Sequence, residues 1–273
     1  MEFFVEGGSA ALGAISESGK HRESKKQQER WIAHKASVFG DWLAECKANY
    51  ELEKSEFDRR MADDDSFRDA IGETPAAELA TGGLDFYYGK GVPRDVPKAL
   101  DYSIAGGFKG DLRGYGAAAT ILMREYMLYD RAAALAYYGA ANNNAYCCQV
   151  LGELFSLESY NYYNPYISYE YYLAAASAAG FVASVFKVAY ARHHGLGIEY
   201  DPAEAVVWYT KIAEKGDVNA QSNLGNLYAE LRDFDKAGYW FHEAALRGDE
   251  EAAEVISYYQ FSKLTQKWSL IEY

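Results

Sequence analysis

Apolar residues from about residue 77 onwards recur at the spacing of amphipathic helices, and the segment 201–231 shows the pattern most completely. Asp201 suits an N-cap, and Pro202 suits the first helical position, which needs no amide donor. Apolar residues then recur every three or four positions until Gly216, which can end a helix, and Asp217 can start the next one. The pattern predicts two antiparallel helices joined by a short turn. One such pair cannot bury its own apolar faces.

The landmarks of this helix pair recur along the chain. With Trp208 as the reference, the equivalent residues are Tyr102, Tyr137, Tyr172 and Trp240, at steps of 35, 35, 36 and 32 residues. A second column, seven positions earlier, consists mostly of Asp: Asp95, Asp130, Pro165, Asp201 and Asp233. Columns that keep register at a period in the thirties indicate an array of helical repeats. We expect five units, at about 77–110, 111–145, 146–180, 181–216 and 217–248.

These residues resemble the Sel1-like repeats, relatives of the tetratricopeptide repeats. The motifs that carry the resemblance are GGLDFYYGKGVPRD at 82–95, HHGLGIEYD at 193–201 with AVVWYTKIAEKGD behind it, and LGNLY at 224–228 with KAGYWFHEAALRGD behind it. The family's Gly-x-Gly loop is present in the first and fourth units only, and the third unit departs most from the pattern. The resemblance covers about residues 77–252. It implies an all-α, α/α superhelical solenoid of about five repeats, with no cofactor and no catalytic activity, whose concave surface binds other proteins.

The segments outside the repeats predict an N-terminal extension and a C-terminal cap. Residues 1–30 are rich in Gly, Ser and Ala and then in charge, which is typical of a flexible or docking segment. Within 31–76, apolar positions step mostly by four and seven, which predicts a long helix that caps the array or crosses its groove. The repeat region, 77–273, is expected to close with a helix at 250–262 that covers the exposed end.

Composition narrows the classes of partner and of location. The formal net charge is −13 and the pI about 4.9, which disfavours nucleic acid and anionic membranes as partners and favours a basic protein. Three cysteines form no disulfide framework. The first residues carry acidic side chains where a signal peptide has positive charge, and no apolar run of membrane length follows. We therefore predict a cytoplasmic protein.

Four short motifs carry possible chemistry, and none fits its chemistry well. GAISESGK at 13–20 has the wrong glycine spacing for a phosphate-binding loop and no preceding strand. Ser184 and Lys187 form the Ser-x-x-Lys pair of penicillin-recognising enzymes, but the chain has no Lys-Thr-Gly partner motif. His193 and His194 are adjacent, so a regular helix cannot direct both at one metal, and they are expected in a loop before Gly195. The three aspartates at 63–65 are read as a solvated turn, and no metal site is predicted.

The stretch ESYNYYNPYISYEYY at 158–172 is the candidate binding site. It replaces the Gly-x-Gly loop of the third unit with aromatic and amide residues, a composition typical of an adaptable binding surface. The alternative is that the rings fill a gap left where the missing glycines let the helices spread. The predicted partner-binding residues are Tyr160, Asn161, Tyr162, Tyr163, Asn164 and Tyr166.

The sequence thus predicts a non-enzymatic protein-binding repeat protein, an adaptor or inhibitor of a basic partner. Its most specific version is a bacterial immunity protein, an antidote that occludes a toxin. Two alternatives stay open. One is a small-ligand binder or β-lactamase-like hydrolase of the cell envelope, based on Ser184 and Lys187. The other is an oligomeric scaffold, in which the long N-terminal helix pairs with a second copy.

Overall fold

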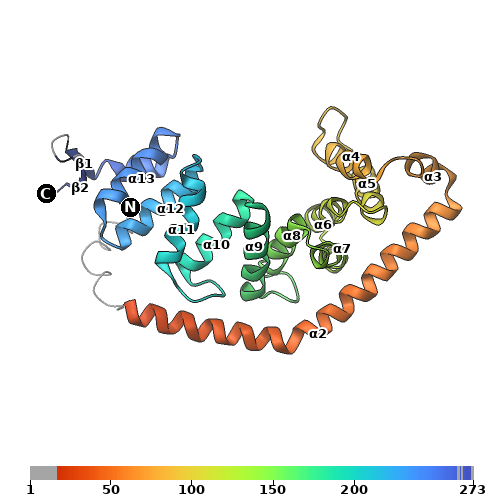
Figure 1. Cartoon of the computed structure of the whole chain (residues 1–273), viewed down its shortest axis with the longest axis horizontal. Coiled ribbons are helices and arrows are strands. Elements are labelled where there is room, and N and C mark those ends of the chain that lie inside the picture. The colour runs from red at the N-terminus through yellow and green to blue at the C-terminus, as the bar shows by residue number, and fades with distance from the viewer. Residues whose placement is uncertain (1–16, 263–264, 266, 272–273) are drawn as a thin grey trace. The chain divides into compact units, whose positions relative to one another are not determined.

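The computed structural model describes residues 17–262, 265 and 267–271, with side chains from residue 25 onwards. Helices account for most of this part of the chain (Figure 1). The contacts between its residues divide the described part of the chain into two compact units. The N-terminal unit comprises residues 30–179. The C-terminal unit comprises the residues from 180 onwards together with the part of α2 before residue 30.

The N-terminal unit consists of a long helix laid on three helix pairs. Its elements are α2 (Glu17–Asp63), α3 (Asp65–Ile71), α4 (Ala76–Tyr88), α5 (Val96–Phe108), α6 (Arg113–Glu125), α7 (Tyr129–Ala141), α8 (Ala145–Phe155) and α9 (Pro165–Ala179). Each helix from α4 to α9 packs on the next, and the first helices of neighbouring pairs also touch. The main core joins apolar residues of α2 to those of α6, α7 and α8.

The C-terminal unit contains two further helix pairs, a short helix and a hairpin. Its elements are α10 (Val182–His194), α11 (Pro202–Ala213), α12 (Val218–Glu230), α13 (Phe234–Leu246), α14 (Glu250–Ile256), β1 (Tyr259–Ser262) and β2 (Lys267–Leu270). The strands are antiparallel, with Phe261 opposite Trp268. The predicted all-α solenoid of five helix pairs is confirmed, and the pair boundaries agree with the predicted units.

Two predicted segments differ from the structure. The terminal helix expected at 250–262 ends at Ile256, and the chain continues as the hairpin. Trp268 explains this difference, because its amide donates to Asp235 Oδ1 at 2.8 Å and its side chain lies against Gly238, so the hairpin is fastened to α13. The helix α2 starts at Glu17, inside the segment expected to be flexible, because the charged run of Lys, Arg, Glu and Gln there favours helix. Residues 1–16 lie outside the described part.

The second helix of each pair begins at a side-chain cap, with one exception. Asp95, Asn164, Asp201 and Asp233 each accept a hydrogen bond from the backbone amide three residues ahead. At α7 the N-cap position holds Leu128, whose side chain cannot accept a hydrogen bond. The aligned Asp column therefore fails at its second member, because Asp130 lies inside the first turn of α7. It fails again at the third member, where Asn164 and not Pro165 caps α9.

A Leu-Gly pair in the first helix of a unit lets the second helix approach closely. A Cβ placed on Gly152 would lie 2.8 Å from the ring of Tyr172, and one placed on Gly225 would lie 2.7 Å from the ring of Phe241. Real Cβ atoms do not come that near to a ring, so only glycine fits at these positions. The repeated glycine thus has a packing role in addition to its value as a sequence landmark.

Candidate functional site

The second half of α2 lies along the helix pairs of the N-terminal unit and buries aromatic side chains against them. Trp42 is 1% exposed, and its ring lies 5.3 Å from that of Tyr137 and 5.0 Å from that of Phe155. Its Nε1–H donates to the hydroxyl of Tyr160 at 2.8 Å. Further along, Tyr50 stacks on Tyr138 with ring centroids 4.2 Å apart. The predicted long helix therefore crosses the repeats of its own unit, and this apolar face is already occupied.

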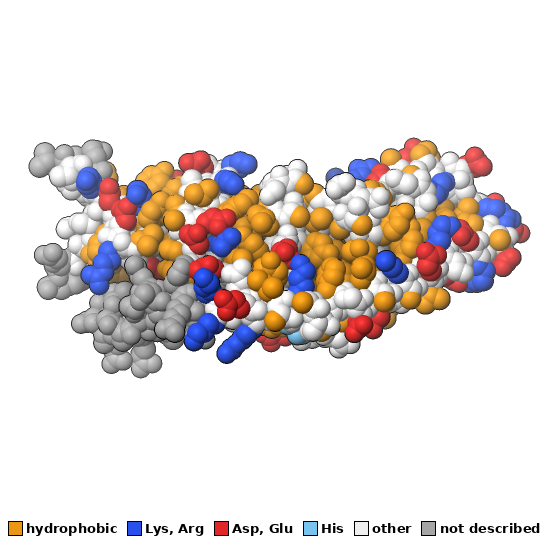
Figure 2. Space-filling model, turned by 60° about the horizontal axis from the view of Figure 1, so that its bottom comes forward, with side chains coloured by type: hydrophobic (Ala, Val, Ile, Leu, Met, Phe, Trp, Pro, Cys, Tyr) orange, Lys and Arg blue, Asp and Glu red, His pale blue; other side chains and the backbone are white. Residues whose placement is uncertain are grey.

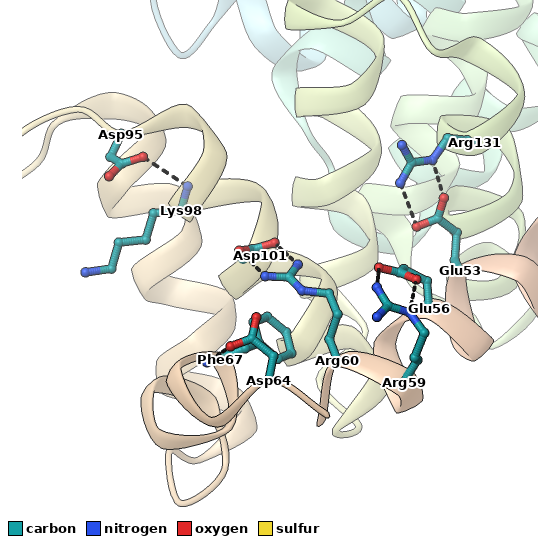
Figure 3. A network of polar contacts seen from close by, with 10 residues as sticks. All are labelled: Glu53, Glu56, Arg59, Arg60, Asp64, Phe67, Asp95, Lys98, Asp101 and Arg131. Atoms are coloured by element: carbon teal, nitrogen blue, oxygen red, sulfur yellow. Dashed lines mark hydrogen bonds and ion pairs between the residues drawn. The ribbon is translucent and has the colours of Figure 1, made fainter. Parts of the chain in front are cut away.

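Ion pairs flank this apolar contact. Arg60 donates to both carboxylate oxygens of Asp101 on α5, at 2.5 and 2.9 Å. Arg131 on α7 makes a two-pronged contact with Glu53 of α2, and Figure 3 shows both guanidinium groups turned towards their carboxylates. Lys35 pairs with Glu170 on α9. These pairs fix the position of α2 along the unit, and Arg131 is paired with Glu53 through two of its three guanidinium nitrogens.

Two of the predicted binding residues lie in the interior. Tyr160 is 3% exposed and accepts the hydrogen bond from Trp42. Asn164 is fully buried; its Oδ1 caps α9, and its Nδ2 donates to the carbonyl of Trp31 at 3.1 Å. Both hold α2 and the loop 156–164 together. The buried positions of these two residues fit the alternative interpretation, in which the loop fills a gap between helices.

The other four predicted residues lie at the surface or on its border. Asn161 is exposed, and the three tyrosines are partly buried. Tyr163 meets the ring of Trp31 edge to face, with centroids 5.4 Å apart, and Lys35 Nζ lies 5.5 Å from the ring centroid of Tyr166. Tyr162 packs on Tyr160, and Glu45 of α2 is close enough to influence the pKa of Tyr162. The structure thus places Tyr162 near Asp41 and Glu45 of α2 and leaves Asn161 at the exposed surface.

A cavity of about 300 Å³ opens beside this loop. It is bounded by Asn49 of α2, by residues 127–131 around the start of α7, and by residues 159–161 of the tyrosine-rich loop. Three apolar residues in the turn between α6 and α7 are exposed: Tyr126, Met127 and Leu128. Met127 has a φ of 54°, in the left-handed region that few non-glycine residues adopt. No motif or repeat landmark marks this turn in the sequence, and its three consecutive apolar residues are the one local signal that could have pointed to it.

Three exposed carboxylates lie around Tyr162 of the tyrosine-rich loop: Asp41 and Glu45 on α2, and Asp130 on α7, which also lines the cavity. Burial, together with the charges of Glu45, Asp41 and Asp130, raises the pKa of Tyr162 to about 12. Burial and the charge of Glu45 raise the pKa of Asp130 above its usual value. Within the described part of the chain, no ion pair joins these three carboxylates to a cationic side chain. The surface is therefore acidic and uncompensated.

The remaining candidate residues form no site of their own. Ser184 is fully buried in α10 whereas Lys187 is exposed, so the pair does not present a nucleophile beside its base. His193 and His194 are the last two residues of α10 and not part of a loop, and their rings stack at 4.3 Å. Asp64 caps α3, and Asp65 pairs with Arg68. Among the described residues, no group of His, Cys, Asp and Glu is arranged to hold a metal ion.

Comparison with known proteins agrees with this geometry. The Sel1 repeat family model matches residues 75–104, 182–217 and 218–249, which correspond to the pairs α4–α5, α10–α11 and α12–α13. The chain contains Sel1 repeats. The pairs α6–α7 and α8–α9 have the same architecture but fall outside the matched segments. They are the two pairs whose connecting turns border the cavity.

Solved structures share the Sel1-repeat fold. One is a protective antigen present in uropathogenic Escherichia coli strains that displays an SLR fold, with 22% identity and a TM-score of 0.60. The match covers 85% of this chain but only 51% of that protein, so the chain spans about half its length. A Sel1 repeat protein from Oxalobacter formigenes matches with 22% identity and a TM-score of 0.54, over 74% of this chain and 87% of that one. A search of curated proteins gives no match.

The Sel1-repeat fold generally serves as a scaffold for protein–protein interaction. No helix among the described residues is both long enough and apolar enough to span a bilayer. The cytoplasmic location stays a prediction.

Proposed function

We propose that this Sel1-repeat protein binds a basic protein partner without catalysing a reaction, as an adaptor or an inhibitor. The observation that supports the proposal most is the group of three exposed, uncompensated carboxylates, Asp41, Glu45 and Asp130, beside the tyrosine-rich loop. Negative charge concentrated on one surface attracts a positively charged partner and speeds its association. Tyrosine rings next to it provide rigid contact area that becomes buried on binding.

Figure 2 shows hydrophobic side chains at the surface between scattered acidic and basic ones. Such a mixture of apolar centres and charged borders is typical of protein interfaces. The specific version that we favour is an immunity protein, which would cover the active surface of a toxin. It predicts that co-expression with the captured partner restores the growth of cells that the partner alone arrests.

The experiment is affinity capture of the tagged chain from cells that express it naturally, followed by mass spectrometry and measurement of the affinity for each recovered protein. We expect a partner with a high pI whose affinity falls steeply between 50 and 500 mM salt, because screening shortens the range of the attraction. The double variant Asp41→Asn/Glu45→Gln should weaken binding about tenfold or more. The matched control is Asp69→Asn/Glu73→Gln, which removes the same charge from two exposed positions at and beyond α3.

Equal losses in the two double variants would mean that only net charge matters, and would refute a localised site. Recovery of acidic partners alone would refute the proposal as a whole. The oligomeric-scaffold alternative has less support, because the apolar face of α2 packs on the repeats of its own chain. Sedimentation of the purified chain as a single monomeric species would remove it. The hydrolase alternative has no support from the buried position of Ser184.

A further inference from the structure

The turn between α6 and α7 has an unfavourable composition for folding. The equivalent turn between α12 and α13 places Arg232, with a φ of 61°, before the capping residue Asp233. In the turn between α6 and α7, Met127 takes the same left-handed conformation, and Leu128 occupies the capping position without capping. An Asp or Asn cap normally stabilises a helix start, and glycine or asparagine adopts the left-handed region most easily.

The two unfavourable side chains are also exposed to solvent. Met127 is 71% exposed and gains little stability by burial in the chain, and Leu128 is 41% exposed and only partly covered. A turn that forgoes a cap and a relaxed backbone in order to display two apolar side chains indicates a contact with another molecule. The turn also borders the 300 Å³ cavity, which lies between it, α2 and the tyrosine-rich loop.

The polar lining of the cavity favours a cation. Asp130 contributes an exposed carboxylate, and the partly buried ring of Tyr129 contributes aromatic surface. Ser159, Asn49 and Asn161 add oxygen atoms that can accept hydrogen bonds. Arg131 is the cationic residue of the lining, and its guanidinium is already paired with Glu53. Because the described residues include no metal-binding cluster, a cationic side chain fits the site better than a metal ion does.

We propose that the α6–α7 turn and its cavity bind a partner segment in which a lysine or arginine stands beside an apolar residue. The basic side chain enters the cavity and faces Asp130, and its aliphatic part lies along the ring of Tyr129, whose face attracts a cation. The neighbouring apolar side chain packs on Met127 and Leu128. This inference rests on the proposed function and names the element and the chemistry of the contact.

The test starts with selection of random peptides displayed on phage against the full chain. We expect enriched peptides with a lysine or arginine next to an apolar residue. An analogue of the best peptide, with norleucine for lysine or citrulline for arginine, should bind the unmodified chain at least tenfold more weakly. The original peptide should lose affinity to the same extent when it binds the Asp130→Asn variant. Asp69→Asn is the control for charge and should leave its affinity unchanged.

A second variant separates binding from folding. Leu128→Asn supplies the missing cap and should raise the melting temperature by roughly 2–4 °C. It should also weaken peptide binding, by about threefold to tenfold, because the apolar contact is lost. A variant that is more stable and yet binds less well cannot owe its defect to misfolding. Met127→Gly, which relaxes the left-handed backbone, should behave in the same way.

Three results would overturn the inference: no enrichment of peptides, enrichment of peptides without basic residues, or binding that Asp130→Asn and Leu128→Asn leave unchanged. The capture experiment distinguishes failure of this inference from failure of the proposed function. If a natural basic partner is captured and loses affinity with Asp41→Asn/Glu45→Gln but not with Asp130→Asn, the protein binds a basic partner elsewhere on the acidic surface. If no basic partner is captured, the proposed function itself fails.

Discussion

Replacing Trp42 with alanine tests whether α2 is an integral part of the N-terminal unit. The side chain is 1% exposed, lies between the rings of Phe39, Tyr137 and Phe155, and donates a hydrogen bond to Tyr160. Truncation of a buried tryptophan removes its transfer free energy and leaves a cavity, which together cost about 3–5 kcal/mol. We expect Trp42→Ala to lower the free energy of unfolding by that amount.

One further variant isolates the contribution of the hydrogen bond, and another is a control at the surface of the same helix. Tyr160→Phe removes only the acceptor and leaves the buried indole N–H of Trp42 unpaired, which should cost about 1–3 kcal/mol. Leu52→Ala is the control on the same helix, because Leu52 is 67% exposed, and its effect should stay within about 0.5 kcal/mol.

The assay is urea unfolding followed by far-ultraviolet circular dichroism, with the midpoint and the slope of the transition compared among variants. If Trp42→Ala costs less than about 1 kcal/mol, or no more than Leu52→Ala, α2 does not pack as described. An early transition confined to a small loss of helix signal would mean that α2 detaches separately from the repeats.

Further predictions concern packing and pH. Gly225→Ala should lower the free energy of unfolding by about 1–3 kcal/mol, because its Cβ would meet the ring of Phe241, whereas Gly40→Ala, with open space around it, should raise it by about 0.5–1 kcal/mol. Thermal unfolding of the two variants checks both signs, and a stabilised Gly225→Ala would contradict the close packing. Burial raises the pKa of both Tyr50 and Tyr162 to about 12, whereas tyrosine in the unfolded chain ionises near pH 10. The contribution of these two tyrosines to stability should therefore be complete below pH 10 and decrease as the pH rises from about 10 to about 12. Tyr162→Phe should make that decrease shallower, and denaturant titrations at intervals of pH would reveal an unchanged slope if the tyrosine is not involved.

The sequence predicted the helix pairs well because the features that define them are local. Caps such as Asp201 and the glycines at the pair boundaries recur at fixed intervals, and each acts within a few residues of its position. The alignment failed at Asp130 because it rested on spacing from Tyr137, and spacing cannot tell a capping aspartate from one two residues further along. The C-terminal hairpin was missed because a contact distant in sequence, between Trp268 and α13, decides its structure.

The candidate site was predictable only in part. Composition singled out the tyrosine-rich loop, and Tyr162 and Asn161 do lie near the acidic surface. Composition could not indicate that Tyr160 and Asn164 face inwards, because that depends on where α2 passes. The cavity is assembled from three segments that are far apart in the sequence, and no local pattern links Asn49 to the turn before Asp130.

The buried thiol of Cys46 gives the chain an internal reporter of motion. It is 3% exposed on the packed face of α2, and burial, together with the charges of Asp130 and Glu45, raises its pKa to about 12. A thiol in that state does not react with alkylating reagents until the helix lifts away from the repeats. Its alkylation rate under native conditions therefore measures how often α2 opens, and a bound partner that clamps α2 to the repeats would slow that rate without touching the sulfur atom.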